Sequence, residues 1–212
     1  MSLGLWTLIY IREKIKKLTA TDLTDAEIDI CINRYYQIIF PMELRPLELQ
    51  TWFEADLTAG TSEYTLASLS FDDSYLTLDN PCYISDIPMI LSLDPSTFYA
   101  KYPQDQTYDN GCPSDILLYD NKLTFMQPPS SDYLEFKASA WTRPSALDND
   151  SDTPIREEWG SIIAYGSSLE VLEDTGDFQT LQLLMPMYEE KKIVISRKRS
   201  QQFYKRRSIP SF

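Results

Sequence analysis

The sequence predicts an α+β fold with N- and C-terminal helices forming a bundle, an antiparallel β-rich insert between them, and an extended C-terminal arm. At both ends of the chain apolar residues recur at helical spacing, whereas in the middle they alternate with polar residues. The last residues combine many cations with few side chains of the type that fills a core. These observations divide the chain into N-terminal helices (1–46), the β-rich insert (47–142), C-terminal helices (143–196) and a basic aromatic arm (197–212).

The N-terminal part is expected to form two antiparallel helices joined by a short turn. Apolar residues recur at helical spacing from Leu5 to Leu18, which predicts the first helix. Thr24 followed three residues later by Glu27 is the signature of a capping box, so the second helix should begin there. Pro41 cannot donate a backbone hydrogen bond, and we expect it to end the second helix.

The middle of the chain is predicted to be strands. Alternation over 49–57 predicts a strand, residues 58–61 turn the chain, and 63–66 should pair back on that first strand. A tight hairpin over 116–126 turns at Asp120-Asn121, and 133–141 is the cleanest alternating segment. Segment 71–79 has no clear period. The remaining expected elements are short strands at 82–84 and 89–93 and a short helix at 97–102.

Two helices are expected after the polar loop that follows the insert. Pro154 suits the first turn of a helix, and Gly176 should end that helix. The last helix is expected from Asp177 through the Lys191 region, with a kink at Pro186.

The charge distribution along the chain is uneven. Residues 191–212 carry eight basic and no acidic side chains, whereas residues 1–190 carry 11 basic and 32 acidic ones, a net charge of −21. An acidic body repels nucleic acid, while a basic tail attracts an acidic partner. We expect this repulsion to keep the isolated subunit monomeric or weakly associated.

Composition argues against an enzyme. The chain has no histidine, which removes the commonest general acid–base group and the commonest metal ligand. It has six glycines and none of the glycine-rich phosphate-binding motifs. The three cysteines have no C-x-x-C spacing, so we expect reduced thiols. The sequence predicts no cofactor, no metal site, no secretory signal and no membrane-spanning segment.

Two acidic patterns bear on that expectation. The alternating carboxylates of 148–152 are typical of calcium loops, but the turn glycine and closing glutamate are missing, which favours a solvated loop. The pairs Asp72-Asp73, Glu54/Asp56 and Asp105/Asp109 would suit a carboxylate-based hydrolase. Such pairs arise by chance among 32 acidic residues, so the hydrolase is the least favoured alternative.

The basic aromatic arm is the candidate binding segment. Cations facing phosphate and rings stacking on bases would suit nucleic acid. Apolar anchors beside the cations would suit an acidic, partly apolar protein groove, and a solvated tail is the third possibility. We favour docking to a protein. The residues expected to carry it are Arg197, Lys198, Arg199, Phe203, Tyr204, Lys205, Arg206, Arg207, Ile209 and Phe212.

Four segments, taken in order, resemble the head-to-tail adaptor (connector, or neck) proteins of tailed bacteriophages. LTDAEIDICINRYYQIIFP resembles the second helix of that family, and AGTSEYTLA resembles its turn and strand, with Ala67 in place of a proline. Residues 110–152 resemble its Gly-x-Pro, hairpin and Pro-Pro turn, and PIREEWGSIIAYGSSLEVLEDTGD resembles its tryptophan-containing helix. Together they cover most of residues 20–180.

The resemblance implies a ring, usually a dodecamer, that sits under the portal protein and prolongs the DNA channel. It implies that the helical part contacts the portal, the β part contacts the next tail or nozzle protein, and the C-terminal arm reaches into the portal. DNA would pass without specific binding, and no membrane would be involved. The expected location is the virion neck, assembled in the host cytoplasm. A DNA-binding protein acting through the basic tail is the main alternative.

Overall fold

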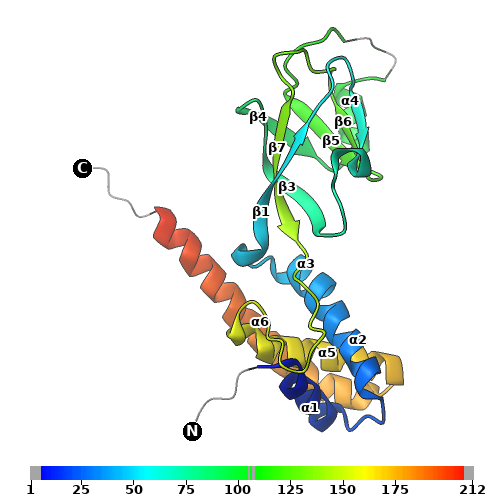
Figure 1. Ribbon diagram of the computed structural model, residues 1–212, viewed down its shortest axis with the longest axis vertical. Coiled ribbons are helices and arrows are strands. Elements are labelled where there is room, and N and C mark those ends of the chain that lie inside the picture. The colour runs from blue at the N-terminus through cyan, green and yellow to red at the C-terminus, as the bar shows by residue number, and fades with distance from the viewer. Residues whose placement is uncertain (1–5, 105, 107, 208–212) are drawn as a thin grey trace, which may run out of the picture. The chain divides into compact units, whose positions relative to one another are not determined.

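The structure is a computed structural model that describes residues 6–104, 106 and 108–207, with side chains described as far as Arg197 (Figure 1). The chain divides into two compact units. One is helical and consists of the residues up to Leu49 and from Arg143 onward, and the other is β-rich and spans Gln50–Thr142. Helices and a sheet in separate parts of the chain confirm the α+β class.

The helical unit is arranged around α5, which contacts α1, α2 and α6 (Figure 1). Gly166 lets α5 approach the preceding helices closely, because a Cβ atom there would lie 2.1 Å from the ring of Tyr35. The elements of this unit are α1 (Leu8–Thr19), α2 (Asp25–Arg34), the π-helical turn η1 (Tyr35–Ile39), α3 (Phe40–Leu44), η2 (Leu47–Leu49), η4 (Glu157–Trp159), α5 (Gly160–Thr175) and α6 (Phe178–Arg207).

The start of α2 is as predicted, but its end is not. The Glu27 amide donates to Thr24 Oγ1 at 3.4 Å, and the Thr24 amide donates to Glu27 Oε2 at 2.8 Å, which confirms the capping box. The expected end at Pro41 is wrong, because the chain stays helical to Leu44. The π-helical turn η1 changes the hydrogen-bond pattern just before Pro41, so the proline falls in the first turn of α3, where its missing N–H is tolerated.

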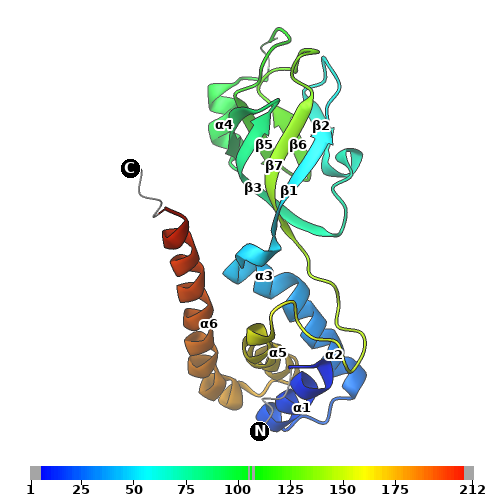
Figure 2. The same cartoon turned by 60° about the vertical axis from the view of Figure 1, so that its left-hand side comes forward.

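The C-terminal helices differ from expectation at two points and match it at a third. Pro154 precedes a non-helical stretch, and α5 begins only at Gly160. Gly176 ends α5 as predicted, with a φ of 74° that favours glycine. The last helix does not end near Lys191, because α6 continues past Pro186 to Arg207 as one helix (Figure 2).

The β-rich unit contains one seven-stranded sheet in the order β1-β7-β3-β4-β5-β6-β2. Its core gathers aromatic rings, and Phe53 lies edge-on to Phe71, Tyr75 and Phe136. The elements are β1 (Gln50–Asp56), β2 (Glu63–Thr65), η3 (Leu66–Leu69), β3 (Tyr75–Ile84), β4 (Ile87–Ser92), α4 (Pro95–Lys101), β5 (Asp115–Tyr119), β6 (Lys122–Phe125) and β7 (Glu135–Thr142).

Local features of this sheet match the prediction, whereas its pairings depart from it. The hairpin turns at Asp120 and Asn121, whose φ values of 50° and 57° give the expected tight turn. The insert is not purely antiparallel, because β4 and β5 are parallel. A crossover through α4 and the following loop returns the chain in the same direction. Strand β2 pairs with β6 rather than with β1, whose partner is β7.

Candidate interaction surfaces

The first half of α6 is fixed to the helical unit by apolar contacts. Leu184, Tyr188 and Ile195 lie on one face of α6 and are 7%, 5% and 9% exposed. Ile195 is the last buried side chain of α6 in the part of the chain whose side chains are described. This face therefore accounts for the packing of α6 as far as residue 195.

A short polar network adds to that anchoring. The Tyr35 hydroxyl donates to the Tyr188 hydroxyl at 3.2 Å, and Tyr188 in turn donates to Glu43 on α3. Lys192 forms an ion pair with the same carboxylate. Burial raises the pKa of both tyrosines, so each hydroxyl keeps its proton and remains a donor at neutral pH.

The other faces of α6 expose apolar side chains to an unusual degree. A helix packed on one side normally carries polar residues on its remaining faces. Here Leu183 is 74% exposed and lies with Met187 and Val194 on a face turned away from the buried one. Such aligned apolar side chains are typical of a protein-binding surface. The exposed apolar side chains of α6 are Phe178, Leu183, Met185, Met187, Ile193 and Val194.

A second exposed apolar row runs along α2, η1 and α3. Ile30, Ile38 and Met42 are 67%, 43% and 44% exposed. Arg34 lies between them in the chain, and its side chain is 58% exposed while it pairs with Glu170 of α5 at 3.3 Å. The helical unit thus presents two apolar rows on different helices.

The predicted arm is only partly covered by the structure. Arg197 lies at an exposed position of α6. The expected change from helix to arm near residue 196 is wrong for the backbone, because helix α6 includes Lys198, Arg199, Phe203, Tyr204, Lys205, Arg206 and Arg207. The side chains of those seven residues, and Ile209 and Phe212 entirely, lie outside the described residues. The helix that carries the basic residues is therefore longer than predicted.

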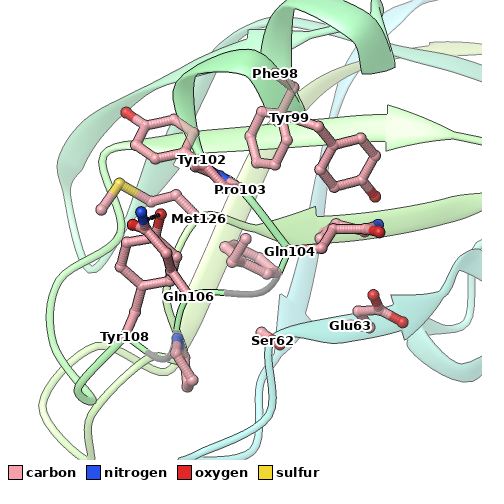
Figure 3. A pocket seen from close by; sticks show the side chains of 13 residues that line it. Ser62, Glu63, Phe98, Tyr99, Tyr102, Pro103, Gln104, Gln106, Tyr108 and Met126 are labelled. Carbon is pink, nitrogen blue, oxygen red and sulfur yellow. Dashed lines mark hydrogen bonds between the residues drawn. The ribbon is translucent and has the colours of Figure 1, made fainter.

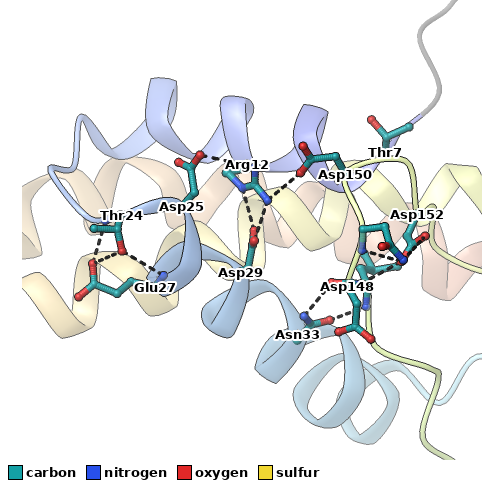
Figure 4. A network of polar contacts seen from close by, with 12 residues as sticks. Thr7, Arg12, Thr24, Asp25, Glu27, Asp29, Asn33, Asp148, Asp150 and Asp152 are labelled. Atoms are coloured by element: carbon teal, nitrogen blue, oxygen red, sulfur yellow. Dashed lines mark hydrogen bonds and ion pairs between the residues drawn. The ribbon is translucent and has the colours of Figure 1, made fainter.

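A buried arginine joins the elements of the helical unit (Figure 4). Arg12 of α1 is 7% exposed, and it donates from Nε and Nη2 to Asp29 of α2 at 2.8 and 2.6 Å. It also pairs with Asp150 at 3.1 Å and with Asp25 at 3.6 Å. The hydrogen bond to Asp29 raises the pKa of Arg12, so the charge is retained. The network ties α1, α2 and the loop before α5 together.

The acidic loop over 148–152 has partners of its own. The backbone amides of Asp148 and Asn149 both donate to Asp152 at 2.9 Å, and these bonds lower the pKa of Asp152. Asp150 points instead toward Arg12 (Figure 4). The carboxylates of this loop do not converge, and no cluster of three metal-binding side chains occurs among the described residues.

The β-rich unit holds an aromatic cleft of about 500 Å³ beside α4 (Figure 3). Phe98, Tyr99 and Tyr102 of the α4 region and Tyr108 line it, and Glu63 of β2 lies at its rim. Aromatic rings beside a few polar groups can hold a small ligand or a peptide side chain. Among the described residues that line it, Glu63 is the one carboxylate, and no basic side chain is present.

One buried carboxylate of the β-rich unit has a structural role. Asp115 is 7% exposed and accepts hydrogen bonds from Lys101 and Tyr102 at 2.8 Å and from Ser114 at 2.6 Å. Burial by itself raises the pKa of Asp115, but these donors outweigh burial and hold the pKa below its usual range. Asp115 therefore fixes α4 to β5 as an ionised group.

Two of the carboxylates considered for a hydrolase have local partners. Glu54 pairs with Lys137 across β1 and β7. Asp72 accepts a hydrogen bond from the Ser74 amide at 2.9 Å, and its pKa is lowered by hydrogen bonds from Ser74. Asp105 lies outside the described residues.

The cysteines have no disulfide partners. Cys31 and Cys82 are buried. Burial raises the pKa of both, to about 12 for Cys82, which disfavours the reactive thiolate form.

Comparison with known proteins does not connect the chain to a family. No protein-family model matches it, and no match was found among curated proteins. Among the described residues, no helix combines the length and the apolar character that crossing a bilayer would require.

Proposed function

We propose that this chain is a structural virion protein, a ring-forming adaptor that joins the portal to the tail and lines the DNA exit channel. The observation that carries the proposal is α6, which is anchored along one face while its other faces expose apolar side chains and its end carries a cluster of cations. A helix of this kind gains stability by burying those faces against other chains.

Charge supports the same function. The β-rich unit contains 14 acidic and three basic residues, a formal charge of −11. A channel wall of this sign repels the DNA backbone and lets DNA slide without sticking. Eight of the 19 basic residues lie within residues 191–212, where they would meet an acidic groove of the portal. The segment order that resembles phage head-to-tail adaptors is consistent with these two roles, a channel wall that repels DNA and a basic segment that meets the portal.

The helical state of the basic segment refines the proposed portal contact. A helix needs no ordering of its backbone on binding, which lowers the entropic cost of docking. The arm would therefore enter the portal groove as an extension of α6 through Arg207, followed by the last residues of the chain.

Portal binding tests the proposal directly. The purified chain is mixed with the portal protein of the same virus and separated by gel filtration. Co-elution of several copies per portal supports the adaptor function. Separate elution over a range of salt concentrations contradicts it.

DNA binding is the second candidate, and a specific observation favours it. Eight basic residues lie within Lys191–Arg207 on one helix, with no acidic residue among them. Lys192 is already paired with Glu43, which leaves fewer cations for phosphate. A DNA affinity that falls steeply with salt, and that is lost on removing residues 197–212, would favour this candidate.

A further inference from the structure

Two exposed rows on the helical unit have matching patterns. The α6 row consists of Leu183, Met187, Glu190 and Val194, at steps of four, three and four residues, which keeps them on one helical face. Leu183, Met187 and Val194 are 74%, 49% and 47% exposed, and Glu190 is exposed as well. The row is therefore apolar with one negative charge near its centre.

The α2 row is its counterpart with the opposite charge. It consists of Ile30, Arg34, Ile38 and Met42, at steps of four residues that pass through the π-helical turn. Ile30 and Ile38 flank Arg34 as Met187 and Val194 flank Glu190. An arginine on one row and a glutamate on the other can pair while the apolar neighbours on either side are buried.

The guanidinium group of Arg34 can form a second ion pair. It pairs with Glu170 through Nε at 3.3 Å, yet its side chain is 58% exposed. A guanidinium group has several N–H donors, so a second carboxylate can bind on its open side. Glu170 is the less exposed partner, at 18%, and it holds the guanidinium in place.

The two rows are both exposed within one chain, so neither covers the other. We propose that the α6 row of one copy packs on the α2 row of the next copy, with Glu190 paired to Arg34. The contact joins two different faces, and repetition of such a contact generates a ring or a filament rather than a two-fold dimer. This assignment rests on the proposed ring-forming function and names the surface that would form the ring.

Cross-linking of cysteine variants tests the assignment. Cys112 is first replaced by Ser, because it is the one partly exposed thiol among the described residues. Arg34→Cys protein is then mixed at high concentration with Glu190→Cys protein and treated with a short bis-maleimide. We expect dimers in the mixture and few in either protein alone. Strong cross-linking of either protein with itself would indicate a two-fold contact and overturn the proposal.

A double variant tests the polarity of the contact. Carrying both Arg34→Cys and Glu190→Cys in one chain should give a ladder beyond dimers, because each copy then has both halves of the contact. The matched control carries Glu189→Cys in place of Glu190→Cys. Glu189 is exposed but lies about 100° further round the helix. A ladder of equal strength in the control overturns the proposal.

Charge reversal provides an independent readout in chains without new cysteines. Arg34→Glu and Glu190→Arg should each weaken self-association several-fold in sedimentation at high protein concentration, and the two together should restore it. Unchanged circular dichroism would show that the variants fold. A double variant no better than the single ones overturns the pairing.

The outcomes separate this proposal from the function on which it rests. Rings that form on the portal without cross-links between residues 34 and 190 overturn the proposed contact and leave the adaptor function standing. Cross-links between copies without portal binding support the contact and count against the adaptor function.

Discussion

Gly166 shows how one residue controls the packing of the helical unit. A Cβ atom added at Gly166 would lie 2.1 Å from the ring of Tyr35, so any side chain here would clash with that ring. The sequence revealed Gly166 only as one member of a helical pattern, because the need for glycine arises from a contact with a residue far along the chain.

Gly166→Ala should therefore destabilise the protein. Alanine favours a helix over glycine by about 1 kcal/mol, but the overpacking against Tyr35 costs about 1–3 kcal/mol. We expect a net loss of stability in urea unfolding. Gln182→Ala, at an exposed position of α6, should leave stability nearly unchanged. A stabilised Gly166→Ala protein would contradict the close contact.

Arg12 should contribute more than any exposed ion pair. Arg12→Gln leaves Asp29 and its neighbouring carboxylates without their cation in a partly buried site, which should cost about 3 kcal/mol. Arg156→Gln is the matched control, since Arg156 pairs with Glu48 at 3.3 Å with a side chain that is 55% exposed. That pair should cost less than about 1 kcal/mol. Equal losses in the two variants would refute the structural role of Arg12.

Asp115 predicts a pH-dependent stability in the β-rich unit. Its folded pKa lies below its unfolded value, which is about 3.9. The stability it contributes is therefore present above pH 4 and is lost as the pH falls through the lower folded pKa. The stability difference between wild type and Asp115→Asn should be constant from pH 7 to about pH 5 and shrink below about pH 4. A difference that persists unchanged at the lowest pH would contradict this assignment.

At the scale of elements, the predictions that rest on short sequence signals are confirmed. The capping box at Thr24 and Glu27, the tight turn at Asp120-Asn121 and the glycine that ends α5 all depend on a few adjacent residues. Pairings of distant segments were not predictable in this way. Strand β2 pairs with β6 rather than with β1, and β5 runs parallel to β4. Both pairings depend on how the whole sheet is assembled, so no short segment of the sequence indicates them.

Strand β3 and helix α6 are both longer than predicted, for different physical reasons. Irregular register between Tyr75 and Cys82 interrupts the alternation that marks a strand. Helix α6 continues through Pro186, which lies between the buried side chains Leu184 and Tyr188, and it extends to Arg207. Leu183, Met187 and Val194 have the helical spacing that a buried face would also show, so only their exposure separates this row from the packed face.

Truncation after Ser196 tests the role of the basic end of α6. The shortened chain keeps Leu184, Tyr188 and Ile195, so its thermal melting should match that of the full chain. Its portal binding should fall sharply, because the cations at 197–207 are removed. Undiminished binding of the truncated protein to portals would contradict the proposed anchor.

For the whole molecule, charge and apolar surface act in opposite directions. A net charge of −13 makes free copies repel one another, while the exposed rows on α2 and α6 favour contact. Repulsion between copies is screened by salt, and a portal that holds copies side by side would overcome it. This balance predicts assembly on a partner rather than in free solution at low salt.

Electron microscopy of the protein mixed with its portal tests the central claim most directly. The adaptor function predicts a closed ring of this chain, coaxial with the portal and continuous with its channel, at a fixed number of copies. In low salt and without portal, the same preparation should show no rings. Portals that remain bare, or that carry this chain at scattered positions without a ring, would contradict the account.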